Sequence, residues 1–212
     1  MTDFANQERT FLQQVLNQRM LICLCTGFAS GLPLYILFQL IPAWLRLEDV
    51  SLTAIGFFNA IQLPYVLKFL WAPLLERYSL PFLGRRRGWM LVIQVSLIFA
   101  IAALGWWKPS TELQAIVLVS IFIAIASATQ DVVLDAYRRE ILETEGELAL
   151  GNNLHVQAYR ISSLIPGSLG LFLIGVVDWH TNFVVMAAFM LVGVGLTLVI
   201  REPALVAPPP GT

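Results

Sequence analysis

The chain has 212 residues, of which 58% are hydrophobic and only 13% charged; its formal net charge is −1 and its mean hydropathy +0.74. A soluble domain with so few charges would aggregate, so this composition excludes the ordinary soluble classes and indicates a membrane protein.

Six apolar stretches follow one another along the chain. A helix needs about 20 apolar residues to cross the hydrocarbon core of a bilayer. The predicted spans are residues 20–44, 52–75, 89–107, 113–135, 154–177 and 183–200. They must be helices, because unpaired backbone groups are not tolerated against lipid. We therefore expect an all-α fold, a six-helix transmembrane bundle over residues 19–201. Residues 1–18 form an inner-surface helix or a frayed segment, and residues 202–212 a proline-rich tail.

Basic residues are segregated between alternate loops. One set holds Arg9, Arg19, Arg77, Arg85, Arg86, Arg87, Arg138, Arg139 and Arg201; the other holds Arg46 and Lys108. Because basic loops stay on the cytoplasmic side, both termini are predicted to be cytoplasmic. The first apolar run is too long for a cleaved signal peptide.

The sequence offers no chemistry for catalysis. It contains no phosphate-binding loop and no Ser-His-Asp pattern, and His155 and His180 are isolated. Cys23 and Cys25 fall on different helix faces and are interpreted as small apolar fillers. We expect no enzyme activity, cofactor, metal site or nucleic-acid partner.

Four charged residues fall inside the predicted spans, where charge is costly: Lys68, Asp131, Asp135 and Arg160. At about 1.5 Å rise per residue, Lys68, Asp131 and Arg160 lie at a similar depth, roughly 12 Å from the inner end of each span. Asp131 and Asp135 are one helical turn apart, which disfavours ionisation of both. The four residues form either a structural charge network or a proton or substrate site.

Polar residues also predict which spans surround that centre. Gln62, Tyr65 and Lys68 share one face of the second span. Spans three and six carry few polar residues, so we expect spans one, two, four and five to enclose a polar centre and spans three and six to lie outside. The GxxxG spacing of Gly27 and Gly31 indicates either close helix packing or a hinge, and Gly167 and Gly170 are interpreted in the same way.

The loop over residues 76–88 is the densest charge run. Glu76, Arg77, Gly84 and the cluster Arg85, Arg86 and Arg87 either set topology alone or lock one access state. An acid-base pair, a turn glycine and an arginine cluster at this place resemble the signature loop of the major facilitator superfamily.

Longer motifs narrow the resemblance. These are GFASGLPL from Gly27, IGFF around Gly56, KFLWAPLLERY from Lys68, GRRRGW from Gly84, SATQDVVLDA around Gln130 and Asp131, and Tyr159-Arg160. Together they resemble the N-terminal half of the AmpG muropeptide permeases. The resemblance implies a proton-driven importer of anhydromuropeptides in the bacterial inner membrane, with Asp131 as the proton-coupling residue and Asp135 as its modulator. From helix faces and depth we also predict that Gln62, Tyr65, Lys68, Gln130, Tyr159 and Arg160 bind substrate or form the charge network, and from their spacing that the glycines pack helices.

The resemblance also implies a partner. The family has a second half of six or more spans, so we expect another six-helix half or a homodimer mate beside this chain in the lipid bilayer. Two other interpretations stay open. The chain is a related permease for another substrate, such as a nucleotide-linked or sugar compound, or it is a truncated membrane protein that does not transport.

Overall fold

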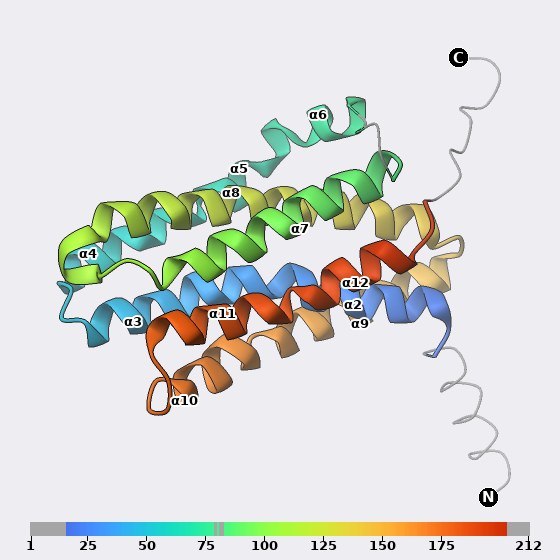
Figure 1. The fold of residues 1–212 in the computed structure, drawn as a ribbon. Helices are drawn as coiled ribbons and strands as arrows, with labels where there is room; N and C mark the ends of the chain where they lie inside the picture. Colours follow the sequence, from blue (N-terminus) through green and yellow to red (C-terminus); the bar gives the residue numbers. More distant parts are fainter. Residues whose placement is uncertain (1–15, 79, 81–82, 203–212) are drawn as a thin grey trace, which may run out of the picture.

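The structure, a computed structural model, describes residues 16–78, 80 and 83–202. Six membrane segments run up and down a bundle (Figure 1). In chain order they are α2 (Gln18–Tyr35), η1 (Ile36–Leu40) and α3 (Ile41–Leu47); α4 (Leu52–Phe57), η2 (Phe58–Gln62), α5 (Leu63–Leu67), η3 (Lys68–Leu70) and α6 (Ala72–Arg77); α7 (Arg85–Leu104); α8 (Pro109–Ile141); α9 (Glu145–Ser162), η4 (Ile165–Gly170) and α10 (Leu171–Leu173); and α11 (Trp179–Phe189) and α12 (Leu191–Val199). The expected inner-surface helix and nearly all of the expected tail lie outside the described residues.

The predicted all-α membrane fold is confirmed. Five helical stretches are long and apolar enough to cross a membrane: Gln18–Leu47, Leu52–Leu70, Arg85–Leu104, Pro109–Ile141 and Trp179–Val199. The fifth segment is not among them, and the prediction of an unbroken apolar span over residues 154–177 is wrong. Its regular helix begins early, at Glu145, in a polar sequence and ends at Ser162.

The π-helical turns of the first and fifth segments lie next to prolines. The fifth segment changes to a π-helical turn at η4, where Pro166 supplies no backbone N–H and its ring crowds the preceding turn. In the first segment the helix passes through Pro33 without interruption, and the π-helical turn η1 comes later, just before Pro42. Helix α2 is regular at Gly27 and Gly31, which lie well before the π-helical turn.

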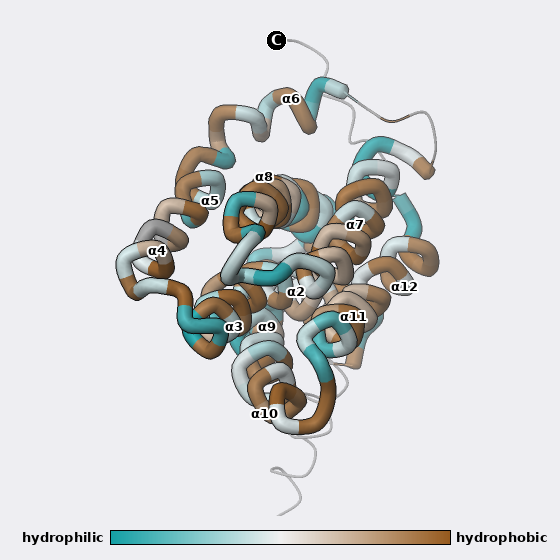
Figure 2. The backbone as a smooth tube through the Cα atoms, turned by 60° about the vertical axis from the view of Figure 1, so that its left-hand side comes forward, coloured by the Kyte–Doolittle hydropathy of each residue, from teal (hydrophilic) through white to brown (hydrophobic). Residues whose placement is uncertain are grey.

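Helix α2 lies at the centre of the bundle. Figure 2 shows it surrounded by the other segments, and it packs on α8, α9 and α12. Its closest neighbour is α9: a β-carbon added at Gly27 would collide with the backbone of His155, and one at Gly31 with Ser162 and Tyr159. The missing side chains let the two helix backbones approach closely.

Other glycines differ in their surroundings. A β-carbon at Gly167 would collide with the side chain of Gln39, and one at Gly170 would press on Leu40 at 3.1 Å. A β-carbon added at Gly56 would meet no atom of another described segment within 4 Å, so the close packing expected there is absent from the described structure.

The second segment, not the third or sixth, is the least covered. It packs mainly on α8 and leaves large apolar side chains exposed, among them Val66, Phe69 and Leu70. By contrast, α7 packs on α8, α11 and α12, and Gln94 of α7 accepts a hydrogen bond of 2.9 Å from the hydroxyl of Thr197 in a fully buried contact. Spans three and six therefore pack against other helices and are less exposed than the second segment, while the polar cavity and its ion pair are formed by spans one, two, four and five, as expected.

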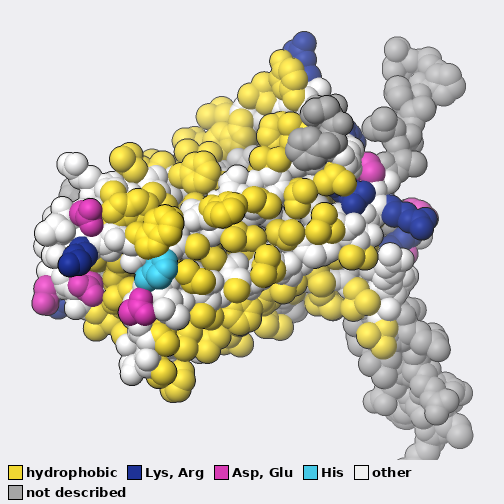
Figure 3. Space-filling view, viewed as in Figure 1, with side chains coloured by type: hydrophobic (Ala, Val, Ile, Leu, Met, Phe, Trp, Pro, Cys, Tyr) yellow, Lys and Arg dark blue, Asp and Glu magenta, His cyan; other side chains and the backbone are white. Residues whose placement is uncertain are grey.

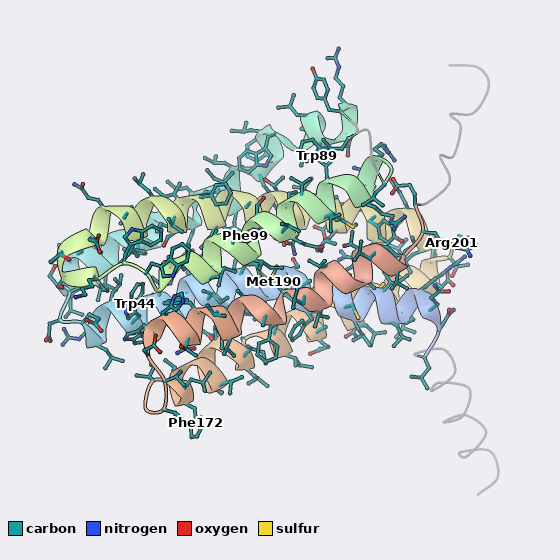
Figure 4. The ribbon with its side chains drawn as sticks, viewed as in Figure 1. Trp44, Trp89, Phe99, Phe172, Met190 and Arg201 are labelled. Carbon is teal, nitrogen blue, oxygen red and sulfur yellow. The ribbon has the colours of Figure 1, made fainter. Side chains whose placement is uncertain are left out.

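Side-chain chemistry divides the surface into a belt and two ends. On the face drawn in Figure 3, apolar side chains cover the middle of the bundle, and charges gather at both ends. Phe99 and Phe172 lie on the belt, each 71% exposed, whereas Met190 and Trp44 are buried (Figure 4). A belt of this kind faces hydrocarbon, which explains why so many large apolar side chains lie on the outside.

We expect Gly27→Ala to lower the free energy of unfolding by about 1–3 kcal/mol, because the new methyl group overpacks the contact between α2 and α9. Gly56→Ala is the matched control: it faces open space and gains helix propensity of up to about 1 kcal/mol. Denaturant unfolding of the purified chain in detergent measures both. Equal stability of the two variants would contradict the close contact.

Candidate transport site

An ion pair joins the second and fourth segments within the membrane. The Lys68 ammonium nitrogen lies 3.3 Å from Oδ2 of Asp131. The hydroxyl of Ser30 on α2 donates a hydrogen bond to the other carboxylate oxygen, Oδ1. The Asp131 side chain is 12% exposed and that of Lys68 is 32% exposed. Three segments thus meet at one carboxylate, and its negative charge is matched where an isolated charge would be costly.

Two further polar contacts hold α8 beside this pair. The Trp71 indole N–H donates to the Thr129 hydroxyl over 3.1 Å. The Gln130 amide donates to the backbone oxygen of Ala29 over 2.9 Å, and its side chain is fully buried. Gln130, expected as a substrate or network residue, therefore ties α8 to α2.

The polar face predicted for the second segment is only partly assembled. Tyr65 lies near Phe38, with ring centres 6.3 Å apart, and its hydroxyl oxygen is buried. Gln62 is exposed and forms no hydrogen bond within the described residues. Of these residues, only Lys68 reaches the carboxylate.

A cavity of about 380 Å³ opens beside Asp131 between α2, α8 and α9. It is lined by Tyr35, Asp131, Asp135, Arg138, His155, Val156, Tyr159 and Arg160. The rings of Tyr35 and Tyr159 meet edge to face across it, 5.6 Å apart. Both aspartates and Arg160 therefore reach one space, as their depths in the sequence suggested.

The pairing inside this cavity differs from the symmetrical one that the sequence allowed. Asp135 pairs with Arg138 on its own helix at 3.0 Å, and Arg138 also donates to Asn152 at 3.1 Å. Arg160 is exposed and forms no ion pair within the described residues. The two carboxylates that line the cavity are therefore each matched by a cation, and Arg160 is an additional guanidinium, which favours an anionic ligand.

The arginine cluster makes specific contacts at the end of the bundle where α2 begins and α12 ends; this is the end predicted to be cytoplasmic, and it is called the inner end below. Arg85 and Arg86 both pair with Glu140 at 2.8 Å, Arg86 through Nε as well. Glu202 accepts the backbone N–H groups of Arg86 and Arg87, which begin α7. These contacts join the loop before α7 to α8 and to the end of α12.

Gly84 and Arg87 shape the same junction. Gly84 has φ of +93°, a conformation that glycine adopts at little cost, and a β-carbon there would collide with Glu202. The Arg87 guanidinium forks onto the backbone oxygens of Thr197 at 3.0 Å and Leu198 at 3.1 Å. Glu76 and Arg77 are exposed and form no side-chain ion pair within the described residues.

A second ion cluster closes the inner end between α2 and α9. Arg19 pairs with Glu143 at 2.6 Å and with Glu147 at 3.0 Å. The backbone N–H of Glu143 and the Arg19 guanidinium hold the pKa of the Glu147 carboxyl below its usual value. Charged contacts thus join five of the six segments at the inner end.

Sequence reasoning missed several residues of these clusters. Ser30, Glu140, Glu202 and His155 were not predicted as site residues. Glu140 and Glu202 carry a visible signal, since each is a carboxylate near a helix end on the side rich in arginine. The described residues contain no group of three or more His, Cys, Asp or Glu side chains placed to hold a metal ion.

An all-helical membrane bundle with a matched charge pair at membrane depth is typical of a secondary transporter. The chain belongs to the Major Facilitator Superfamily, whose sequence pattern matches residues 23–212. It is 50% identical to an uncharacterised Haemophilus influenzae protein over 90% of this chain and 45% of that protein. It is 40% identical to the anhydromuropeptide permease of Escherichia coli over 95% of this chain and 41% of the permease. A Rickettsia typhi protein with AmpG in its name is 33% identical over 86% of this chain and 44% of that protein. The chain therefore spans less than half the length of these relatives.

Replacing Arg87 with lysine should lower the melting temperature by about 2–4 °C, the shift expected for a loss of about 1 kcal/mol in a chain of this size. A lysine ammonium cannot reproduce the fork onto two carbonyl oxygens. Arg77→Lys is the control with the same change of chemistry at an exposed position, and it should leave the melting temperature unchanged. If both variants have the melting temperature of the wild-type chain, the two hydrogen bonds of Arg87 contribute nothing to stability.

Proposed function

We propose that this chain forms one half of a proton-driven transporter that imports anhydromuropeptides across the bacterial inner membrane, with the inner ends of its helices in the cytoplasm. The proposal rests on one observation above the others. A carboxylate at membrane depth, Asp131, is shared by Lys68 and Ser30 and borders a cavity that holds an additional guanidinium, Arg160. The similarity to the Escherichia coli permease supports this choice of substrate.

Asp131 has two alternative partners in this mechanism. As a carboxylate it binds Lys68, and as a neutral acid it releases the ammonium group. When a proton binds Asp131, Lys68 can turn to another anion, and the second segment loses one of its polar ties to α8. Proton binding is thereby coupled to the position of a helix, which is the requirement for proton-driven transport.

Arg160 is the residue that would receive the substrate. Peptide stems of muropeptides carry carboxylates, and a guanidinium binds a carboxylate through two parallel hydrogen bonds. Tyr35 and Tyr159 lie in the same cavity and offer apolar ring faces beside it. Asp135 modulates the site through Arg138, its partner on α8.

The second half of the site comes from another six-helix unit. Transporters of this architecture bind substrate between two halves that rock about the membrane midplane. The exposed second segment, which carries Lys68 at membrane depth, is available to face such a partner. The arginine cluster and Glu140 then act at the inner end as a lock on one access state, through contacts that lysine cannot copy.

Asp131→Asn tests the coupling. The chain is expressed together with the remaining part of the Escherichia coli relative, and uptake of labelled anhydromuropeptide is measured in membrane vesicles. We expect the wild-type pair to concentrate substrate when a proton gradient is imposed. The Asp131→Asn pair should lose uphill uptake and keep exchange of substrate down its gradient, because asparagine cannot carry the proton.

Glu145→Gln removes an exposed carboxylate at the start of α9 and serves as the control, with uptake expected to match the wild-type pair. Uphill uptake by the Asp131→Asn pair would remove Asp131 from the coupling step. Absence of any uptake by the wild-type pair would contradict the proposed transport.

A further inference from the structure

His155 is a buried histidine that the transport mechanism above does not use. It lies on α9 with 8% of its surface exposed, at the point where Gly27 lets α2 approach the α9 backbone. Its side chain lines the same cavity as Asp131, Asp135 and Arg160. A titratable ring is therefore held between two helices, beside the carboxylates that are proposed to carry the proton.

The hydrogen bonds of Thr26 assign the tautomer of this ring. The Thr26 hydroxyl donates its single proton to the backbone oxygen of Cys23 over 3.0 Å. The same oxygen lies 3.3 Å from Nδ1 of His155. A hydroxyl that gives its single proton to Cys23 can only accept from Nδ1, and the proposal takes this tautomer, with the ring hydrogen on Nδ1. In the neutral ring, Nε2 then holds the lone pair and is the atom that can accept a proton.

The charges around the ring determine what such a base can do. Asp135 and Arg138 of α8 and the Cys23 backbone of α2 lie close enough to act on the ring. The other titratable groups that line its cavity are Tyr35, Asp131, Tyr159 and Arg160. Asp131 is matched by Lys68, and Asp135 by Arg138. The ring is thus a base whose neighbouring charges are largely paired, and an imidazole can both accept a proton and release it again.

We propose that His155 is the relay that takes the coupling proton from Asp131 toward the inner side, an inference that rests on the proposed proton-driven function. The Asp131 carboxylic acid gives up its proton, directly or through water in the cavity, and returns to the carboxylate that binds Lys68. Nε2 of His155 accepts that proton while Nδ1 keeps its own hydrogen on Thr26. The imidazolium then passes the Nε2 proton to water on the inner side and becomes neutral again.

Two features favour this direction. Asp135 lies one turn beyond Asp131 toward the inner end of α8 and stabilises a passing positive charge. Arg138, a turn further on, repels the charged ring and so favours its release of the proton. Thr26 fixes the ring so that the same nitrogen receives each proton. His155 therefore transfers the proton, while Arg160 binds a carboxylate of the substrate and Lys68 pairs with the carboxylate of Asp131.

The tautomer can be measured on the chain alone, without transport. The chain contains only two histidines, so ¹⁵N-histidine labelling in lipid nanodiscs gives two imidazole spin systems. His180→Gln identifies the one from His155. We expect its neutral form to carry the hydrogen on Nδ1, and Thr26→Val, which removes the acceptor but keeps the shape, to abolish that preference. A hydrogen on Nε2, or no response to Thr26→Val, overturns the assignment.

The relay is tested in the co-expressed pair. His155→Asn can keep a donor toward Thr26 but has no group that accepts a proton, so uphill uptake should fall about tenfold or more, the scale of a lost acid-base group. Exchange down a gradient should continue, which shows that the variant is folded. Unchanged uphill uptake in His155→Asn, with uptake still lost in Asp131→Asn, overturns the relay and leaves the proposed function standing. No uptake by the wild-type pair overturns both, whatever the tautomer.

Discussion

The cost of placing charge inside a membrane is the constraint on which this structure depends. Lys68 and Asp131 neutralise one another's charge in an ion pair, and Ser30 donates a further hydrogen bond to the carboxylate. The pair also determines architecture, because the second segment packs mainly on α8 and the pair, together with Trp71 and Thr129, supplies its polar contacts there. One interaction therefore neutralises the charges and positions a helix.

The remaining polar groups are arranged in levels along the bundle. The cavity beside Asp131 lies within the membrane, His155 faces it between α2 and α9, and the ion clusters of Glu140 and Arg19 lie at the inner end. Under the proposed proton-driven function, a proton taken up at Asp131 is passed inward while the inner clusters hold the helices together. Close approach at Gly27 and Gly31 keeps α2 and α9 in register, so the movement is expected in the second segment.

The sequence predicts the parts of this arrangement that follow from helix geometry and hydropathy. Five of the six segments follow from apolar length, and the equal depth of Lys68 and Asp131 follows from the rise per residue. The partner of Asp135 cannot be predicted from depth alone, because Arg138, three residues along the same helix, pairs with it in place of Arg160. Glu202 capping α7 depends on which helix ends meet, and the break in the fifth segment depends on how Pro166 is accommodated. The tautomer of His155 depends on one hydroxyl direction, which is set only when α2 and α9 pack.

The most direct test of the central claim is a double-mutant cycle on Lys68 and Asp131, measured by unfolding of the chain in lipid nanodiscs. Lys68→Met and Asp131→Asn each leave one charge without its partner, and the double variant removes both charges. The account predicts that the double variant is more stable than the sum of the two single losses implies, with a coupling free energy of about 1 kcal/mol or more. Strictly additive losses would mean that the two charges do not stabilise one another, and would contradict the account.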